Sequence, residues 1–414
     1  MSNRRVVITG LGVAAPNGIG KEEFWKANIE GRSGVGKITS FDVSNFESKI
    51  CGQIKDLENS NYIPKEEVRK IDRFVHLGLI SAKAALDDSR LDPGKEDKDR
   101  IGVIIGSGLG GLLFHEEQIM AAYDKGTRRI NARSVPRISP NAVASHIAIQ
   151  HGLMGPNMVI SNACASGTFA IGEAFRLIQS NDMDVCLSGG AEAPLTEFTF
   201  GAYSVLRVLS RNNDFPQEAS RPFDKKRDGF VLGEGSAVLI LEELTHALKR
   251  NAHIYAEIAG YGSNSGAYHI VMPEPQGRDA AKAMRKVLQD AQAKPEDVDY
   301  INAHGTATTL NDKAETSAIK EVFGSHAYKI PVSSTKSMIG HSIGAAGAIE
   351  ALVCALVIEN NLIPPTINYK YPDPDCDLDY VPNQARKAKV DVVLTNSFGF
   401  GNCNGCLILK RYSD

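Results

Sequence analysis

Short apolar runs that end in glycine or small-residue turns alternate with segments of helical spacing along the chain. The run at Val6–Ile8 leads into Gly10–Gly12 and predicts a first strand followed by a turn. Apolar residues recur at helical spacing between Phe169 and Ile178, which predicts a buried helix. Strands and helices in alternation favour an α/β fold built in layers.

The second part of the chain repeats this pattern. Tyr255–Gly262 has the strand-then-glycine order of Val6–Gly12. In the same way, Pro331–Thr335 leads to a small-residue helix at Gly344–Ala348, much as Val159–Ser161 leads to its own helix. These parallels indicate an internal duplication, with two halves that share one plan.

A helix predicted over Glu242–Arg250 separates the two halves. Its acids come first and its bases last, an order that complements the helix dipole. We place the boundary just after this helix. The division gives an N-terminal half over residues 1–254 and a C-terminal half over residues 255–414.

Composition indicates a globular protein of two packed domains and excludes several classes of function. The 414 residues carry a net charge of -3 with no basic tract, so nucleic acid is not an expected partner. No apolar segment approaches the length of a membrane span, and the apolar N-terminal run is too short for a signal peptide. We therefore expect a cytoplasmic protein without a membrane span.

Seven cysteines without a regular framework predict reduced thiols rather than disulfides. Cys403 and Cys406 form a CxxC string, but no second pair accompanies them. Gly405–Leu409 predicts a strand, in which residues three apart face opposite sides. The glycines of Gly106–Gly111 lack the spacing of a dinucleotide fingerprint. Neither a metal nor a nucleotide cofactor is expected.

Cys164 stands where the apolar strand at Val159–Ile160 breaks at a small-residue turn before the predicted helix. A lone cysteine in apolar surroundings is usually a packing residue. A thiol at a helix N-terminus, however, faces free backbone N–H groups and the positive end of the dipole, which favour the thiolate. This position predicts a nucleophile that points into a cavity.

Two histidines follow short apolar strands farther along the chain. His304 follows the run Val298–Ile301, and His341 comes soon after Ile330–Ser333. Loops at strand ends are where sheets present catalytic groups. Either histidine alone could be structural, but together with Cys164 they give three reactive side chains in three similar contexts.

Four motifs in this order resemble those of the β-ketoacyl-acyl-carrier-protein synthases. They are NACASG around Cys164, NAHGTAT around His304, STKSMIGH from Ser334 to His341, and NSFGFG from Asn396 to Gly401. The similarity runs over nearly the whole chain and fits the decarboxylating, elongating branch best, in the class of synthase II. It implies the thiolase fold, in which two similar halves stack as αβαβα layers with the active site between them.

The resemblance implies a Cys-His-His acyltransferase that condenses an acyl group with malonyl-carrier protein in fatty-acid elongation. Cys164 would take the acyl chain as a thioester, and the backbone N–H groups of Cys164 and Phe400 would stabilise the tetrahedral oxyanion. After loss of carbon dioxide, neutral His304 and His341 would donate hydrogen bonds to the enolate. The enolate carbon would then attack the acyl-enzyme.

Two further residues of the chemistry follow from the same resemblance. Lys336 would orient the site and tune its electrostatics through Glu350, although a lysine taken alone is more often a surface residue. Phe400 would also act as a gate beside the cysteine.

The resemblance also implies how substrates are held. Thr306 and Thr308 would bind the amides of the phosphopantetheine arm, while Leu109 and Phe398 would contact the acyl substrate. No soluble cofactor is expected, because the arm arrives covalently attached to the acyl carrier protein.

An acidic carrier protein should seek basic residues near the mouth of the tunnel. Lys65, Arg69 and Arg207 are the contacts we expect, and the resemblance implies a homodimer.

Several positions depart from the family pattern. In the gating loop, the family pattern Phe-Gly-Phe-Gly-Gly has glycine where this chain has Asn402, which is followed by Cys403. Ile339 replaces the usual threonine, and Thr309 replaces a common proline. Val271 falls where the family often has a threonine that faces the arm. Asn tolerates positive φ better than other non-glycine residues, so the turn can survive with less freedom. We expect altered acyl or carrier preference rather than lost catalysis.

Other interpretations remain open to different degrees. A thiolase also uses an activated cysteine, and Cys403 invites that comparison, but the histidine pair argues against it. The branch of condensing enzyme III, with Cys, His and Asn, is disfavoured because position 341 is histidine. A non-catalytic chain-length partner is disfavoured because Cys164 is retained. A polyketide-type ketosynthase is harder to exclude.

Overall fold

The computed structural model describes residues 4–55, 57 and 63–413, and one continuous sheet path organises this part of the chain. Its strands lie in the order β11-β10-β14-β15-β9-β1-β8-β7-β5-β6. The N-terminal half contributes β1 (Val6–Ala15), β5 (Ile101–Gly106), β6 (Asn157–Ile160), β7 (Val185–Glu192) and β8 (Gly235–Glu243). The C-terminal half contributes β9 (Ala256–Ser265), β10 (Tyr300–Asn302), β11 (Val332–Ser333), β14 (Val392–Gly399) and β15 (Cys403–Lys410).

The two halves have the same strand pairing. In the first half, β5 runs parallel to β6 and β7, whereas β8 runs antiparallel to β7 and β1. In the second half, β10 runs parallel to β11 and β14, whereas β15 runs antiparallel to β14 and β9. Antiparallel pairing of β1 with β9, with Val6 opposite Ile258, joins the halves. The predicted duplication is therefore present in the topology, and the exact boundary after residue 254 stays a prediction.

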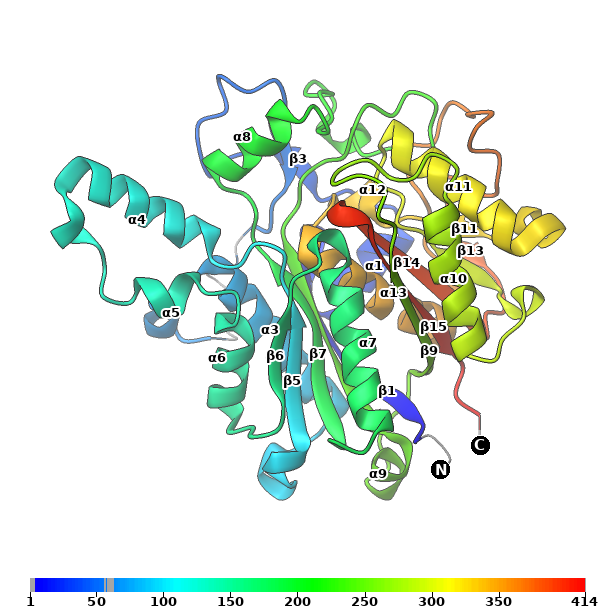
Figure 1. Cartoon of the computed structure of the whole chain (residues 1–414), viewed down its shortest axis with the longest axis horizontal. Helices are drawn as coiled ribbons and strands as arrows, with labels where there is room; N and C mark the ends of the chain where they lie inside the picture. The colour runs from blue at the N-terminus through cyan, green and yellow to red at the C-terminus, as the bar shows by residue number, and fades with distance from the viewer. Residues whose placement is uncertain (1–3, 56, 58–62, 414) are drawn as a thin grey trace.

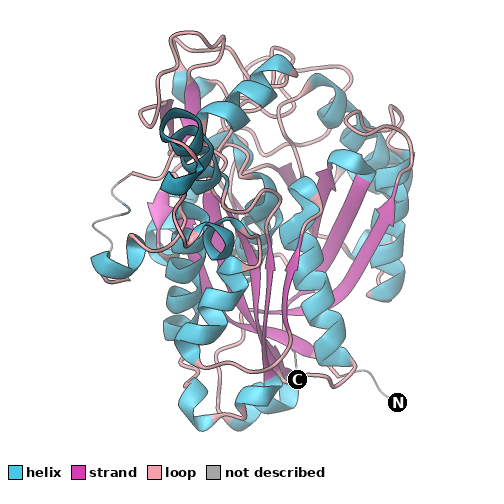
Figure 2. Cartoon of the chain, turned by 60° about the vertical axis from the view of Figure 1, so that its left-hand side comes forward, coloured by secondary structure: helices cyan, strands magenta, loops and turns pink. Residues whose placement is uncertain are grey.

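Helices form three layers around these strands (Figures 1 and 2). One outer layer contains α3 (Arg73–Ser89) and α6 (Ala142–His151), which pack on the first half, and the other contains α10 (Arg278–Asp290) and α11 (Thr309–Phe323), which pack on the second. Between the two halves lie α7 (Ser166–Gln179) and α13 (Ala346–Asn360), which contact strands of both. The predicted αβαβα arrangement of the thiolase fold is confirmed.

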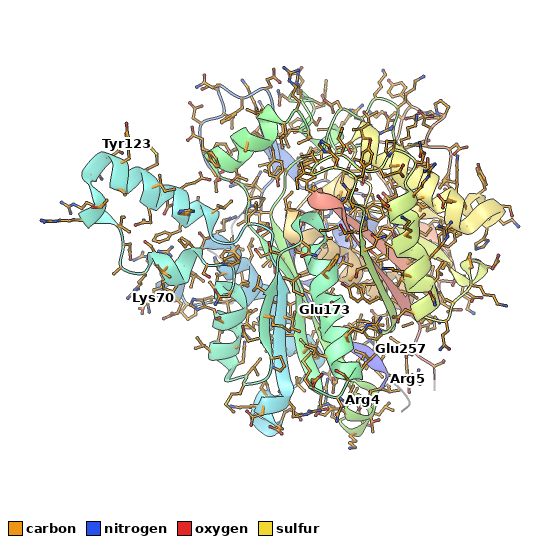
Figure 3. All side chains as sticks on the ribbon, in the orientation of Figure 1. Arg4, Arg5, Lys70, Tyr123, Glu173 and Glu257 are labelled. Carbon is orange, nitrogen blue, oxygen red and sulfur yellow. The ribbon has the colours of Figure 1, made fainter. Side chains whose placement is uncertain are left out.

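The remaining strands and helices lie outside the main sheet path and the three helix layers. They are β2 (Gly18–Ile19), β3 (Val35–Lys37), β4 (Ile50–Gly52), β12 (Leu362–Ile363), β13 (Arg386–Lys387), α1 (Lys21–Ile29), α2 (Lys65–Val68), α4 (Leu112–Lys125), α5 (Ser134–Ile138), α8 (Glu197–Val205), α9 (Leu244–Lys249) and α12 (Lys336–Ile339). In Figure 1, α4 and α5 form an arm that projects from the body, and Figure 3 shows Tyr123 near its outer end.

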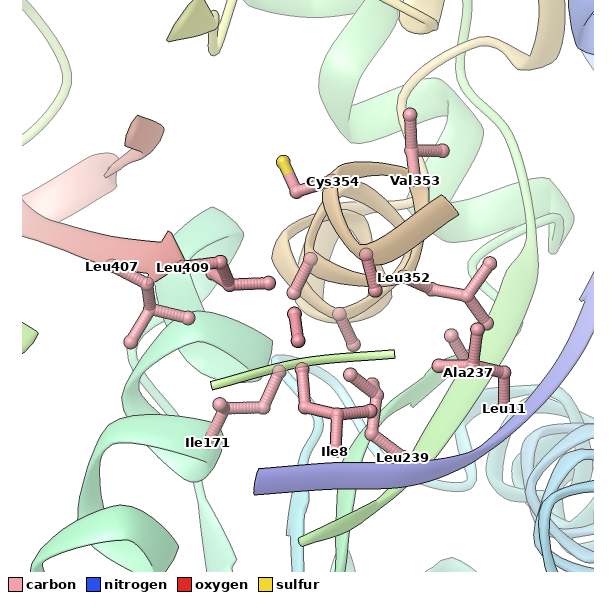
Figure 4. Close-up of a cluster of buried hydrophobic side chains, with 14 of the residues drawn as sticks. Ile8, Leu11, Ile171, Ala237, Leu239, Leu352, Val353, Cys354, Leu407 and Leu409 are labelled. Carbon is pink, nitrogen blue, oxygen red and sulfur yellow. The ribbon is translucent and has the colours of Figure 1, made fainter. Parts of the chain in front are cut away.

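The middle layer holds the largest part of the apolar core. Every residue of α13 from Ala346 to Ile358 is buried, because the helix packs against both halves and against α7. Figure 4 shows Leu352 in a cluster that includes Ile8 and Leu239 of the first half and Leu409 of the second. Such a helix is apolar on all sides, as a helix without a solvent face must be.

This central helix corrects one expectation from the sequence. The segment Ile343–Asn360 has 18 residues with a mean hydropathy of 1.6, so its length and composition are those of a membrane span. Our statement that no apolar segment approaches that length was wrong. In the structure, however, 89% of the segment is buried inside the protein, and its apolar character is accounted for by packing between the halves.

The helix predicted over Glu242–Arg250 begins later than expected. Glu242 is the penultimate residue of β8, and its buried carboxylate accepts hydrogen bonds from Thr9 and Arg250. Glu243 ends β8 and is also the N-cap of α9, and its Oε2 accepts the backbone N–H of His246 at 2.9 Å. Both acids thus belong to the sheet, and only Glu243 caps the helix.

The middle layer also brings the functional turns together. An added Cβ on Gly167 would lie 2.8 Å from the backbone nitrogen of Ala348, so the first turns of α7 and α13 pack backbone against backbone. The turn after β6, which leads to α7, therefore meets the loops after β10 and β11 at one face of the core.

Leu352→Ala tests the importance of the middle layer. Leu352 has no exposed surface, and truncating a core leucine costs about 2–5 kcal/mol because of lost burial and the cavity that remains. We expect a fall of this size in the free energy of unfolding, measured by urea titration. Leu248→Ala, at an α9 position that is 47% exposed, is the matched control and should change it by less than about 0.5 kcal/mol. Equal small effects would contradict this view of the core.

Candidate active site

Cys164 lies in a tight turn at the start of α7. The turn is a 3-10 segment, Ala163–Ala165, in which Ala163 has a φ of 48°. Ser166 braces it, because its Oγ accepts the backbone N–H of Asn162 at 2.9 Å and donates to the Ala163 carbonyl at 2.7 Å. A non-glycine residue held at positive φ beside a nucleophile marks a strained turn whose geometry the surroundings fix.

The Cys164 thiol is buried and faces backbone N–H donors. The residue is 6% exposed, and the backbone N–H groups of Phe400 and of Cys164 itself act to lower the pKa of the thiol. The two expected oxyanion donors therefore both act on the sulfur. Burial nevertheless raises the pKa of the Cys164 thiol to about 12, although Lys336 and the two N–H groups act in the opposite direction. The backbone N–H groups favour the thiolate, as expected, but desolvation outweighs them and the thiol stays protonated at neutral pH.

His304 is held by a buried carboxylate that the sequence analysis missed. Glu315 in α11 accepts the backbone N–H of His304 through Oε1 and that of Gly305 through Oε2, each at 2.8 Å. Asn396 of β14 donates to the same Oε1 at 3.1 Å. Glu315 thereby fixes the loop after β10 in one conformation.

Lys336 sets the tautomer of His304. Its Nζ donates to the His304 carbonyl at 2.6 Å and lies 3.3 Å from the ring Nδ1. An ammonium group can only donate, so Nδ1 accepts and the proton of the neutral ring resides on Nε2. His304 consequently has one N–H left to donate.

Lys336 and Glu350 form a buried ion pair. Each side chain is 2% exposed, and Nζ of Lys336 donates to Oε1 of Glu350 in a short hydrogen bond. Burial raises the pKa of Glu350 to about 7 in spite of the lysine. The predicted link between these residues is present, and the lysine is not a surface residue.

His341 completes the cluster. Its ring centroid lies 5.4 Å from that of His304 with the two rings nearly perpendicular, and 5.3 Å from that of Phe230. Within the described part of the chain, neither ring nitrogen of His341 has a hydrogen-bond partner. Burial, together with Lys336, holds the pKa of both histidines well below the usual range, so both rings are neutral at pH 7.

These groups open onto one cavity of about 320 Å³. The residues predicted from the sequence that line it are Cys164, His304, His341, Thr306, Thr308, Phe398, Phe400 and Arg207. The two threonine hydroxyls lie 2.9 Å apart, and Phe398 packs edge-on against His304 with ring centroids 5.7 Å apart. The structure thus assembles most of the predicted site around a single space.

Other predicted residues lie elsewhere. Among the described residues that line the cavity, Leu109 is absent, and its backbone N–H donates instead to Glu192 at 3.3 Å. Arg69 is exposed after α2, where its carbonyl accepts from Arg137, and it does not line the cavity either. The side chain of Lys65 lies outside the described residues.

The positions that depart from the family pattern also divide into residues that line the cavity and residues that do not. Val271, Thr309 and Asn402 line the cavity. Ile339 is buried in α12, and Cys403 begins β15, so neither belongs to the described cavity wall. Among the described residues, no group of three or more His, Cys, Asp or Glu side chains could hold a metal ion.

Two more contributors escaped the sequence analysis. Glu192, at the end of β7, accepts from Ser107 Oγ at 3.0 Å and from the backbone N–H groups of Gly108 and Gly344 at 2.6 and 3.1 Å. Tyr203 lines the cavity and packs edge-on against Phe230. A usable signal for Glu192 was its place as the one acid in an otherwise small and apolar run from Val185 to Ala193.

Comparison with known proteins decides the family. A family model described as the β-ketoacyl synthase N-terminal domain matches residues 3–247, and the corresponding C-terminal domain model matches residues 255–370. The chain belongs to the β-ketoacyl synthase family. The resemblance inferred from the four motifs is confirmed.

Similar proteins agree with this assignment over full length. Two relatives are named 3-oxoacyl-[acyl-carrier-protein] synthase 2. The Coxiella burnetii protein is 47% identical, and the match covers 100% of both chains. The Synechocystis sp. protein is 46% identical, and the match covers 100% of this chain and 99% of the relative. A solved structure of a type II PKS acyl-carrier protein in complex with its ketosynthase bound to the hexaketide matches with a TM-score of 0.93 at 37% identity, covering 99% of this chain and 100% of its own.

The pKa of Cys164 gives a testable pH dependence. A thiol whose pKa is raised to about 12 stays protonated at neutral pH, and its thiolate fraction grows about tenfold per pH unit. Alkylation of Cys164 by iodoacetamide should therefore keep rising from pH 7 to pH 9 without levelling off. Intact-mass spectrometry measures the rate, with Cys164→Ala as the blank for the other cysteines. A plateau below pH 8 would contradict this expectation, because it would show that Cys164 is already mostly thiolate at that pH.

Proposed function

We propose that this β-ketoacyl synthase is an elongating 3-oxoacyl-acyl-carrier-protein synthase, which condenses an acyl group on Cys164 with malonyl-carrier protein by decarboxylation. The observation that carries the proposal is the convergence of Cys164 and two neutral histidines on one cavity, with the buried Lys336 in contact with His304. The full-length relatives named 3-oxoacyl-[acyl-carrier-protein] synthase 2 support the same reaction.

Acyl transfer comes first in the proposed reaction. The acyl-carrier thioester reaches Cys164, whose proton passes to a neutral histidine, and the sulfur attacks the carbonyl carbon. The N–H groups of Cys164 and Phe400, which act to lower the pKa of the thiol, stabilise the oxyanion. The phosphopantetheine thiolate leaves and takes up the proton, so the products are the acyl-enzyme and the free carrier.

Decarboxylation and carbon–carbon bond formation follow. The malonyl carboxylate leaves as carbon dioxide, and its electron pair forms an enolate at the thioester. His304 donates to the enolate oxygen through Nε2, the nitrogen left free by Lys336, and His341 provides the second donor. The enolate carbon then attacks the acyl-enzyme carbonyl, and release of the Cys164 thiolate gives a 3-oxoacyl-carrier protein extended by two carbons.

The proposed substrates arrive on an acyl carrier protein, and the arm takes the place of a soluble cofactor. Thr306 and Thr308 line the cavity and offer hydroxyls to the amides of the arm. Arg207 is exposed at the same cavity and offers a positive charge to an acidic carrier. The similar ketosynthase that was solved in complex with its acyl-carrier protein supports this partner.

A homodimer in the cytoplasm belongs to the same proposal. The strand β6 is the last strand of the sheet path, with Met158 39% exposed, and Met154 beside it is 64% exposed. The arm of α4 and α5 adds Tyr123 and Val135 at 88% and 75% exposure. An open edge and apolar side chains near it are features that a second copy would cover.

A polyketide-type ketosynthase is the second candidate. The same solved type II PKS structure favours it, because its similarity also covers nearly the whole chain. A thiolase receives no such support, since Cys403 lies outside the described cavity wall and His341 is part of it.

Acylation of Cys164 is the direct test of the proposed function. Wild-type protein mixed with a panel of acyl-carrier proteins should gain one acyl mass, and later addition of malonyl-carrier protein should yield a product longer by two carbons. Intact-mass spectrometry follows both steps. Cys164→Ala should gain no acyl mass, whereas Cys403→Ala, which alters a partly exposed cysteine outside the cavity wall, should behave like wild type. Absence of acyl mass with every donor would reject the proposal.

Glu315→Gln separates positioning of His304 from attack by Cys164. The amide offers one oxygen where the carboxylate accepts two backbone N–H groups, so the His304 loop loses a fixed position. We expect decarboxylation of malonyl-carrier protein to fall about 10- to 100-fold, while acyl transfer to Cys164 changes less than threefold. Glu321→Gln, on the exposed face of the same helix, is the control. Equal loss in both steps would mean that Glu315 supports the whole site rather than His304.

A further inference from the structure

Asn402 makes side-chain contacts that glycine could not make. It is 7% exposed and has a φ of 56°, at the end of the turn Phe400–Asn402. Its carboxamide nitrogen donates to the carbonyl of Met272 at 3.2 Å and, in a short hydrogen bond, to the carbonyl of His269. One side chain in the gating turn is thus bound twice to a segment more than a hundred residues earlier in sequence.

That segment, residues 267–273, is called here the mouth loop. Its side chains Tyr268, Ile270 and Met272 are 50%, 72% and 40% exposed, and Val271 and Met272 line the cavity. His269 organises the loop from within, because its Nδ1 accepts the backbone N–H groups of Val271 and Met272 at 3.0 and 3.1 Å. The loop therefore has its own internal structure and lies at the opening of the site.

Backbone contacts join the turn and the mouth loop as well. The N–H of Gly401 donates to the Ile270 carbonyl at 2.7 Å, and the N–H of Gly266 donates to the Asn402 carbonyl at 2.8 Å. The first bond joins the turn to the mouth loop, and the second joins the turn to the residue just before that loop. At the start of the turn, Phe400 lines the same cavity as Cys164, and its N–H acts to lower the pKa of the Cys164 thiol.

We propose that Asn402 is a positioning residue that latches the mouth loop to the Phe400 turn, so that the oxyanion donor and the cavity opening move as one unit. Asn is suited to this position for two reasons. It adopts positive φ at lower cost than other non-glycine residues, and its carboxamide supplies the two N–H donors that the carbonyls need.

The latch has a consequence for the reaction, and this consequence rests on the proposed function. Phe400 is the gate that the family resemblance implies beside Cys164. In this chain, motion of that gate would require either release of the Asn402 bonds or displacement of the mouth loop. The exposed Ile270 and Met272 place the loop within reach of a docking carrier protein. Contact at the loop would then be transmitted to the Phe400 turn through three hydrogen bonds, one from Gly401 and two from Asn402.

Asn402→Gly tests the latch because glycine keeps the positive φ and removes only the side-chain bonds. We expect alkylation of Cys164 by iodoacetamide at constant pH to rise about 5- to 30-fold, as two hydrogen bonds of ordinary strength no longer favour the closed turn. Hydrogen exchange of the peptide that contains residues 266–273 should accelerate in the same variant. Asn402→Asp, which replaces the donors by an acceptor facing two carbonyls, should give at least as large an effect.

Asn251→Gly is the matched control. Asn251 also has positive φ, at 51°, but lies in an exposed turn after α9. Its replacement should leave the alkylation rate and the exchange of the mouth loop unchanged. Thermal unfolding midpoints within about 2 °C of wild type would verify that each variant is folded.

The proposal is overturned if folded Asn402→Gly and Asn402→Asp alkylate within twofold of wild type, or if alkylation rises with no change in exchange of the mouth loop. The first result would leave Asn402 as a turn residue only, and the second would uncouple the two segments. Alkylation and exchange use no acyl donor or carrier protein. Failure of the latch is therefore distinguishable from failure of the proposed condensation, which the acylation test measures separately.

Discussion

The close approach of α7 and α13 in the middle layer is the constraint on which the rest of the structure depends. Gly167 of α7 leaves no room for a Cβ against Ala348, and a Cβ on Gly347 of α13 would lie 2.1 Å from Thr168 Oγ1. Each helix begins beside a functional turn of its own half, so this contact brings Cys164 from the first half to the histidines of the second. A duplicated fold thereby acquires one shared site instead of two separate ones.

Three buried carboxylates then fix the parts that the helices have brought together. Glu315 holds the His304 loop, Glu192 gathers the loops at Gly108 and Gly344, and Glu350 pairs with Lys336. Burial raises the pKa of each to about 7, which shows the cost of keeping a charge in this interior. Backbone N–H groups and one ammonium offset that cost, and the same bonds hold the loops that carry the predicted catalytic residues.

The sequence motifs pointed to the predicted reacting residues but not to the buried carboxylates that hold their loops in place. Cys164, His304 and His341 each follow an apolar strand, a pattern that is visible in one dimension. Glu315 and Glu192 act through backbone groups of other elements, 10 and 11 residues away for Glu315 and 84 and 152 residues away for Glu192, and no periodicity marks such contacts. Burial posed the same difficulty, because it depends on packing of both halves: α13 has the composition of a membrane span, and the thiol of Cys164 gains a raised pKa where the helix N-terminus alone predicts a lowered one.

The protonated thiol and the latch have one physical basis. Cys164 is buried beside the Phe400 turn, and burial is what raises its pKa and, together with Lys336, keeps the histidines neutral. If the turn opens as proposed, the sulfur meets solvent and that effect weakens, so access to the predicted nucleophile and its activation would be coupled. The hydrogen bonds from Asn402 to the mouth loop would therefore affect the reactivity of Cys164 without contact with a reacting atom, because they would set the fraction of time for which the thiol is shielded from water.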